Sequence, residues 1–244
     1  MDQRLHQKKQ GTQKLNIVSL FSGIGGLDKG FSDAGFNVIW ANDFDKYAVK
    51  TYNCNFPNPA ICADLNEIDI NTIPEHDVLI GGFPCQPFSM MGKEKGFDDK
   101  RGTLFFRVVE IIINQRDRGH QPRIVVLENV RNLLKHDKGR TFKLIKETLE
   151  NLGYHVFADK LNSADYGVPQ SRRRVVFVGL QEGEFEYPEP VKEIVINGES
   201  LEVEDNRVEI PIVVPVSSLY PIETLLPPTE REYTTSPLTA ALSL

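Results

Sequence analysis

The feature that most constrains the fold of this chain is an alternation between short apolar runs and longer amphipathic stretches. The apolar runs are rich in Val, Ile and Leu, and several are followed by glycines or by a segment with helical spacing of its apolar residues. This alternation is typical of βα units whose parallel strands are covered on both faces. The sequence therefore predicts an α/β fold with a Rossmann-like, doubly wound, mostly parallel sheet. The expected strands are residues 15–21, 36–42, 77–82, 123–130 and 173–180, and the expected helices are residues 25–35, 45–56, 103–115 and 141–153, with Tyr47, Val49 and Tyr52 facing inward.

The charge of the chain divides at about Leu180. The 244 residues carry a formal net charge of −6, but the part up to Leu180 has 25 Lys and Arg against 21 Asp and Glu, and the remainder has 3 against 13. The first part is able to face a polyanion, which would repel the acidic remainder. We expect a flexible lead-in over 1–13, a catalytic domain over 14–180, and an acidic connector or partner-docking tail over 181–244, in which "EIVING" and "LEV" suit a small hairpin.

Cysteine content and hydropathy bear on the compartment. The three cysteines show no metal-ligand spacing and are too few for a disulfide framework, which favours a reducing cytoplasm and predicts no metal site. We interpret Cys54 and Cys62 as buried structural cysteines. The sequence has no run of about 18 apolar residues, and its polar start does not resemble a secretory signal, so we expect no membrane association.

A glycine-rich stretch, "FSGIGG", follows the first expected strand. Gly23 and Gly25 would let a ligand approach the backbone at the start of a helix. Asp28 occupies the place where a dinucleotide fingerprint has its third glycine, whereas Asp43 ends the next strand and suits the hydroxyls of a ribose. Asp64 could hold an adenine amino group. The pattern favours a nucleoside cofactor; a tight turn is the alternative for the glycines, and an ordinary turn residue is the alternative for Asp64.

Cys85 stands in the constrained loop "GGFPCQPFS", directly after a buried strand. Structural cysteines usually lie within apolar segments, whereas here Pro84 and Pro87 fix the loop on both sides of the thiol. This placement favours a nucleophilic cysteine. The charged, glycine-hinged segment Met90–Gly102 that follows is typical of a lid.

Two further strand ends carry polar groups. Glu128 and Asn129 follow an apolar run, where a desolvated carboxyl group with a raised pKa could transfer a proton; a salt-bridged Glu and a helix-capping Asn are the alternative. In "QSRRR", the side chains of Arg172 and Arg174 would point to one face of an extended segment and that of Arg173 to the other. Two arginines aimed at one site suit a phosphate or a base edge.

Six segments in this order, "FSGIGGL", "ANDFDKYA", "GGFPCQPFS", "RGTLFF", "ENV" and "YGVPQSRRRVVFVG", resemble the motifs of DNA cytosine-5 methyltransferases over about residues 15–180. The resemblance implies that Cys85 attacks C6 of a flipped cytosine, that Glu128 contacts N3, and that S-adenosylmethionine donates the methyl group. It also implies that Arg172 and Arg174 contact the base and the catalytic loop, and that Gln86, Ser89 and Asn129 bind substrate. The implied cofactor-pocket residues are Phe21, Gly23, Gly25, Asp43, Phe44, Asp64, Leu65, Pro84 and Leu104.

The family's target recognition domain and late pocket segment have no counterpart in these residues. We therefore expect the catalytic subunit of a split enzyme of a bacterial restriction–modification system, which acts on double-stranded DNA with a second subunit that carries the missing motifs. The alternatives are an inactive truncated fragment, a non-enzymatic regulator on the methyltransferase fold, and a tRNA cytosine-5 methyltransferase.

Overall fold

A seven-stranded mixed sheet organises the described part of the chain. The computed structural model describes residues 14–84, 104–191, 193–196 and 199–202. The strand order is β3-β2-β1-β4-β5-β7-β6, and only β7 runs antiparallel to its two neighbours. The predicted fold class is confirmed. The strands are β1 Asn16–Leu20, β2 Asn37–Asp43, β3 Ile61–Cys62, β4 Val78–Gly81, β5 Ile124–Val130, β6 His155–Asn162 and β7 Arg173–Leu180, with a separate antiparallel hairpin of β8 Glu193–Ile196 and β9 Glu199–Glu202.

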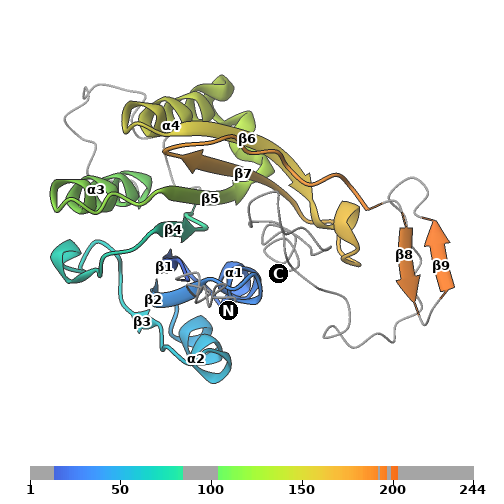
Figure 1. Cartoon of the computed structure of the whole chain (residues 1–244), viewed down its shortest axis with the longest axis horizontal. Helices are drawn as coiled ribbons and strands as arrows, with labels where there is room; N and C mark the ends of the chain where they lie inside the picture. Colours follow the sequence, from blue (N-terminus) through green and yellow to red (C-terminus); the bar gives the residue numbers. More distant parts are fainter. Residues whose placement is uncertain (1–13, 85–103, 192, 197–198, 203–244) are drawn as a thin grey trace, which may run out of the picture.

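Helices cover both faces of the sheet, with α3 and α4 on one side and α1 on the other (Figure 1). Alternate residues of β1 show the division: Val18 and Leu20 pack with α3 and α4, whereas Ile17 packs with Phe31 of α1. The helices are α1 Gly26–Asp33, α2 Lys46–Asn55, α3 Leu104–Asp117 and α4 Arg140–Asn151, with short 3-10 helices at Ile70–Thr72, Arg131–Leu134, His136–Gly139 and Ser163–Tyr166.

Local capping signals explain where the second helix begins. The side chain of Asp45 accepts hydrogen bonds from the backbone N–H groups of Tyr47 and Ala48, as expected for an aspartate at a helix N-cap. Val49 and Tyr52 are buried as predicted, but Tyr47 is 70% exposed, so its predicted inward orientation is wrong. Tyr47 is the second residue of α2, at the end of a stretch, residues 44–47, in which every residue is exposed.

The interpretation of two cysteines as buried structural residues is also wrong. Cys54 and Cys62 are exposed free thiols. Cys54 lies in the last turn of α2, and Cys62 lies in β3, the two-residue strand at the outer edge of the sheet. Neither position is enclosed by a second layer. Among the described residues, no helix is long and apolar enough to cross a membrane.

Candidate active site at the carboxyl edge of the sheet

Three chain segments meet where the central parallel strands end. Leu20, the last residue of β1, pairs with Gly81, the last residue of β4, and Gly81 pairs with Leu127 of β5. The glycine turn after β1, the loop after β4 and Glu128 on β5 therefore lie at the same edge of the sheet. In open α/β folds, ligands bind beyond this carboxyl edge.

The glycine turn needs its glycines for different reasons. Gly23 and Gly25 have φ angles of 56° and 96°, in the left-handed region. A Cβ on Gly25 would lie 2.2 Å from the Phe56 ring, whereas nothing lies within 4 Å of one on Gly23. Phe21 also has a positive φ, 53°, which is uncommon for a residue with a side chain. Position 25 therefore needs a glycine because the Phe56 ring packs against it, whereas the open space beside Gly23 is accessible to a ligand.

Asp43 anchors the glycine turn. One of its carboxylate oxygens accepts a hydrogen bond from the Gly23 N–H at 2.8 Å, and the other accepts one from the Asp45 N–H at 2.8 Å. The carboxylate is thus engaged by backbone groups on both sides, although each of its oxygens has a further lone pair. Phe44, which follows, is 74% exposed and presents its ring to solvent.

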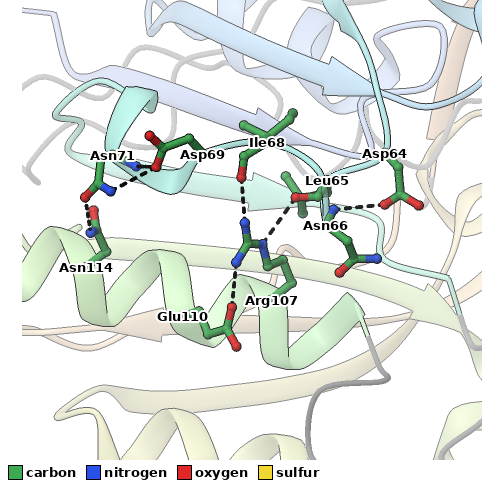
Figure 2. Close-up of polar contacts among 9 residues, drawn as sticks. All are labelled: Asp64, Leu65, Asn66, Ile68, Asp69, Asn71, Arg107, Glu110 and Asn114. Atoms are coloured by element: carbon green, nitrogen blue, oxygen red, sulfur yellow. Dashed lines mark hydrogen bonds and ion pairs between the residues drawn. The ribbon is translucent and has the colours of Figure 1, made fainter.

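Asp64 lies in a turn next to β3 (Figure 2). Its Oδ1 accepts a hydrogen bond from the Asn66 N–H at 2.9 Å, and its backbone carbonyl accepts one from Glu67. Asp64 itself is exposed, and the next residue, Leu65, is buried in the core. The two predicted cofactor residues are therefore adjacent, with one side chain facing solvent and the other holding the turn to the protein.

Glu128 is held by both predicted arginines. Arg174 Nε lies 2.6 Å from Glu128 Oε1, and Arg172 Nη2 lies 3.7 Å from the same oxygen. The predicted common orientation of these two arginines is confirmed. Burial raises the pKa of the Glu128 carboxyl group, and the charges of Arg174 and Arg172 offset part of that rise. Burial likewise lowers the pKa of Arg172, and Arg174 adds to the effect.

The second oxygen of Glu128 faces the loop that precedes Cys85. A Cβ on Gly82 would lie 3.3 Å from Glu128 Oε2, so a larger residue would crowd this oxygen. Asn129 donates a hydrogen bond to the Phe83 carbonyl at 2.8 Å, which ties the same loop to β5. Its Oδ1 accepts from the adjacent Val130 N–H, and no side chain caps the 3-10 helix that begins at Arg131. The helix-capping alternative for Asn129 is therefore wrong.

The remaining predicted residues flank the undescribed segment or lie within it. Pro84 is exposed, and Leu104 is half-buried at the first residue of α3. Cys85, Gln86 and Ser89 lie outside the described residues. The described parts of residues 14–202 contain no cluster of three or more His, Cys, Asp or Glu suited to a metal ion.

Sequence reasoning missed two networks that support this edge. Asp28 is fully buried and accepts hydrogen bonds from Ser19 Oγ at 2.9 Å and from Tyr52 Oη at 2.8 Å. The Tyr52 ring stacks on Phe56 at 4.2 Å, and Phe56 in turn fills the space beside Gly25. Because a buried tyrosine hydroxyl almost always has a hydrogen-bond partner, Tyr52 was the signal that could have drawn attention to this carboxylate. The second network centres on Arg107 (Figure 2).

Comparison with known proteins decides the family. The family model described as C-5 cytosine-specific DNA methylase matches residues 15–214, which is most of the chain. The chain belongs to this family. The match includes every segment at the carboxyl edge described above, from the glycine turn to the arginines of β7.

Two Type II methyltransferases are similar to this chain over most of its length. It is 46% identical over 186 residues to the Type II methyltransferase M.NgoBI of Neisseria gonorrhoeae, a match that covers 76% of this chain and 57% of that protein. It is 42% identical over 190 residues to the Type II methyltransferase M.NlaX of Neisseria lactamica, covering 76% of this chain and 59% of that protein. The chain thus matches a little over half of the length of these relatives.

A solved structure confirms the fold. The S. pombe Dnmt2 methyltransferase superposes with a TM-score of 0.59 at 22% sequence identity, over 71% of this chain and 53% of that chain.

Proposed function

We propose that this chain carries the catalytic residues of a DNA cytosine-5 methyltransferase and transfers a methyl group from S-adenosylmethionine to C5 of cytosine in double-stranded DNA. The observation that carries the proposal is the half-buried Glu128, held by Arg174 and Arg172 on one oxygen, with its other oxygen facing the loop that leads to Cys85. Membership of the C-5 cytosine-specific methylase family supports the same reaction.

Glu128 fits the group that activates the base. C6 of cytosine is a poor electrophile until N3 is protonated or accepts a strong hydrogen bond. Because burial raises the pKa of Glu128, its carboxyl group keeps a proton at a higher pH than an ordinary glutamate does. Oε1 faces the arginines, so Oε2 is the oxygen that we assign to N3.

Cys85 fits the nucleophile. In the proposed reaction its thiolate forms a bond to C6 of a flipped cytosine while N3 takes a proton from Glu128, and the electron pair of the C5–C6 double bond moves to C5. Bound S-adenosylmethionine supplies the methyl group that C5 takes up. A base then removes the C5 proton, the double bond forms again, the thiolate leaves and the proton on N3 returns to Glu128.

The residues at the glycine turn fit this cofactor. The space beside Gly23 is open, and the exposed Phe44 ring can cover the face of an adenine. The unbonded lone pairs of Asp43 suit the ribose hydroxyls, and Asp64 suits the adenine amino group. We assign Phe21, Gly25, Leu65, Pro84 and Leu104 to the walls of the same pocket, and Gln86, Ser89 and Asn129 to the substrate side.

We propose further that a second polypeptide reads the DNA sequence, within a bacterial restriction–modification system. The incomplete coverage of the Type II relatives supports a contribution from outside these residues. The test is to express the chain in a bacterium with the product of a neighbouring reading frame, and to map 5-methylcytosine in the host DNA by bisulfite sequencing.

We expect methylation at one short sequence with the pair, and little or none with the 244-residue chain alone. The Cys85→Ser variant should abolish methylation and keep the affinity for S-adenosylmethionine within about twofold, because a thiol that attacks the base need not hold the cofactor. Methylation by the Cys85→Ser pair would refute the assigned nucleophile. Sequence-specific methylation by the chain alone would refute the need for a partner.

A further inference from the structure

The turn that carries Asp64 is fixed from both sides. On the side of the sheet, Asn42 Nδ2 of β2 donates hydrogen bonds to the carbonyls of Ile61 at 3.0 Å and Ala63 at 2.8 Å, directly before Asp64. On the other side the turn contacts α3 through Arg107. Within the described residues, the Oδ2 atom of Asp64 has no hydrogen-bond partner, whereas Oδ1 accepts from Asn66. The Oδ2 atom of Asp64 is therefore available to a ligand, and the turn that carries it is held in place by β2 and α3.

Arg107 holds this turn with its planar fork of N–H groups. Its Nε donates to the Leu65 carbonyl at 3.2 Å and its Nη2 donates to the Ile68 carbonyl at 2.6 Å (Figure 2). Its Nη1 also pairs with Glu110 Oε2 at 2.7 Å, one turn further along α3. The Arg107 side chain is 18% exposed and that of Glu110 is 45% exposed. The hydrogen bonds of Arg107 to the turn are thus shielded from solvent, whereas its ion pair with Glu110 lies towards solvent.

The geometry of the fork matters because the two carbonyls lie three residues apart. A guanidinium group can donate to both at once from a fixed plane, whereas a lysine ammonium is a single point with no such preset directions. Asn114 is seven residues after Arg107 on the same helix, and its Nδ2 donates to Asn71 Oδ1 at 2.9 Å at the far end of the same loop (Figure 2). Gln115 of the same helix donates to the carbonyls of Ile73 and Pro74, further along the loop. Among the side-chain hydrogen bonds from α3 to the described loop, only those of Arg107 reach the backbone next to Asp64.

We propose that Arg107 is a positioning residue for nucleoside recognition: by fixing the Leu65 and Ile68 carbonyls, it orients Asp64 towards the amino group of an adenine. This inference rests on the proposed use of S-adenosylmethionine. Arg107 touches neither cofactor nor base in this assignment, and acts only through the backbone next to Asp64.

A role limited to stability would give a different pattern from a role in orientation. Loss of a structural contact weakens binding of every ligand alike, or lowers only the melting temperature. Loss of orientation removes selectivity for the group that Asp64 contacts. The informative quantity is therefore a ratio of two dissociation constants measured on the same variant, which cancels changes in the amount of folded protein.

The test uses two probes, S-adenosylhomocysteine and its analogue with oxygen in place of the adenine amino group. The 244-residue chain, together with its partner polypeptide once that is known, is titrated with each probe by calorimetry. We expect the unaltered protein to prefer the amino probe by about tenfold or more, because the analogue presents an acceptor to a carboxylate. Asp64→Asn and Arg107→Met should each reduce the preference to within about twofold, and the double variant should reduce it no further.

Matched variants on the same helix serve as controls. Asn114→Ala removes a contact with the far end of the loop, and Glu110→Gln removes only the exposed ion pair of Arg107; both should keep the preference. Arg107→Lys keeps the charge and should lose most of the preference, which covers the case that Arg107→Met does not fold. A tenfold preference retained by Arg107→Lys or Arg107→Met would overturn the inference. Failure of the unaltered protein to bind either probe would instead contradict the proposed cofactor.

Discussion

Asp28 gives this protein a dependence of stability on pH that can be tested by one substitution. The carboxylate is fully buried between β1, α1 and α2, and burial raises its pKa from 3.8 to about 6, although the hydroxyls of Tyr52 and Ser19 oppose the rise. Well below pH 3.8 the carboxyl group is protonated in both the folded and the unfolded chain, so its burial does not lower the free energy of unfolding. Above about pH 6 it is ionised in both states, and the folded state carries the penalty.

The size of the penalty follows from the two pKa values. The difference between 3.8 and about 6 corresponds to about 3 kcal/mol of unfolding free energy, present below the lower pKa and lost as the pH rises through the higher one. Asp28→Asn has nearly the same shape and does not titrate. The free energy of unfolding of the variant minus that of the unaltered chain should therefore rise by about 2.5 kcal/mol between about pH 4 and pH 7.

Urea denaturation followed by circular dichroism at a series of pH values measures this difference. Other carboxylates titrate in both proteins and cancel, and any loss of hydrogen bonding in the variant adds an offset that does not change with pH. A difference that stays constant within about 1 kcal/mol over this range would show that the pKa of Asp28 is not raised in the folded protein.

Three further substitutions test the site. Glu128→Gln should lower the methylation rate by about 10²- to 10⁴-fold and leave cofactor affinity unchanged, as single-turnover kinetics and calorimetry would measure; a rate within about threefold would exclude proton transfer by this residue. Gly25→Ala should lower the melting temperature and weaken cofactor binding, because its Cβ would overlap Phe56; the pair Gly25→Ala and Phe56→Ala should recover part of the binding, and no recovery would argue against this overlap. Arg174→Met should lower the rate and raise the pKa of the Glu128 carboxyl group, because a neighbouring positive charge is removed, so the pH profile should move towards higher pH; a profile that moves to lower pH would contradict the assigned ion pair.

The pattern of apolar runs predicted most of the sheet because the strands that it found are buried on both faces. Val78–Gly81 is buried at every position, so its sequence is uninterrupted by polar residues. The edge strand His155–Asn162 was missed because its exposure has no period of two: the first six positions are exposed or half-buried, and only the last two are buried. Ile61–Cys62 is too short to carry any pattern, and only its pairing with β2 makes it a strand.

The site was predicted best where a single residue type has few structural uses. Arg172, Arg174 and the half-buried Glu128 are such a case, since a charged group withdrawn from solvent needs a group of opposite charge beside it. Asp28 was read only as a departure from a glycine pattern, because its partners Ser19 and Tyr52 lie 9 and 24 residues away and come together only in the fold. Arg107 gave no signal at all, since its partners are backbone carbonyls and any residue supplies those.

The direction of β7 has a consequence for any attempt to transplant this site. β7 is the one strand that enters the sheet at the edge where the parallel strands leave it, so Arg174 near its start lies opposite Val130 at the end of β5. Had this eight-residue strand run parallel to β5, its first residues would lie at the opposite edge, roughly 25 Å away. A designer who moved Glu128 onto an all-parallel scaffold would have to place its arginines on a loop at the carboxyl edge. Here the reversed direction of β7 brings the arginines to that edge without such a loop.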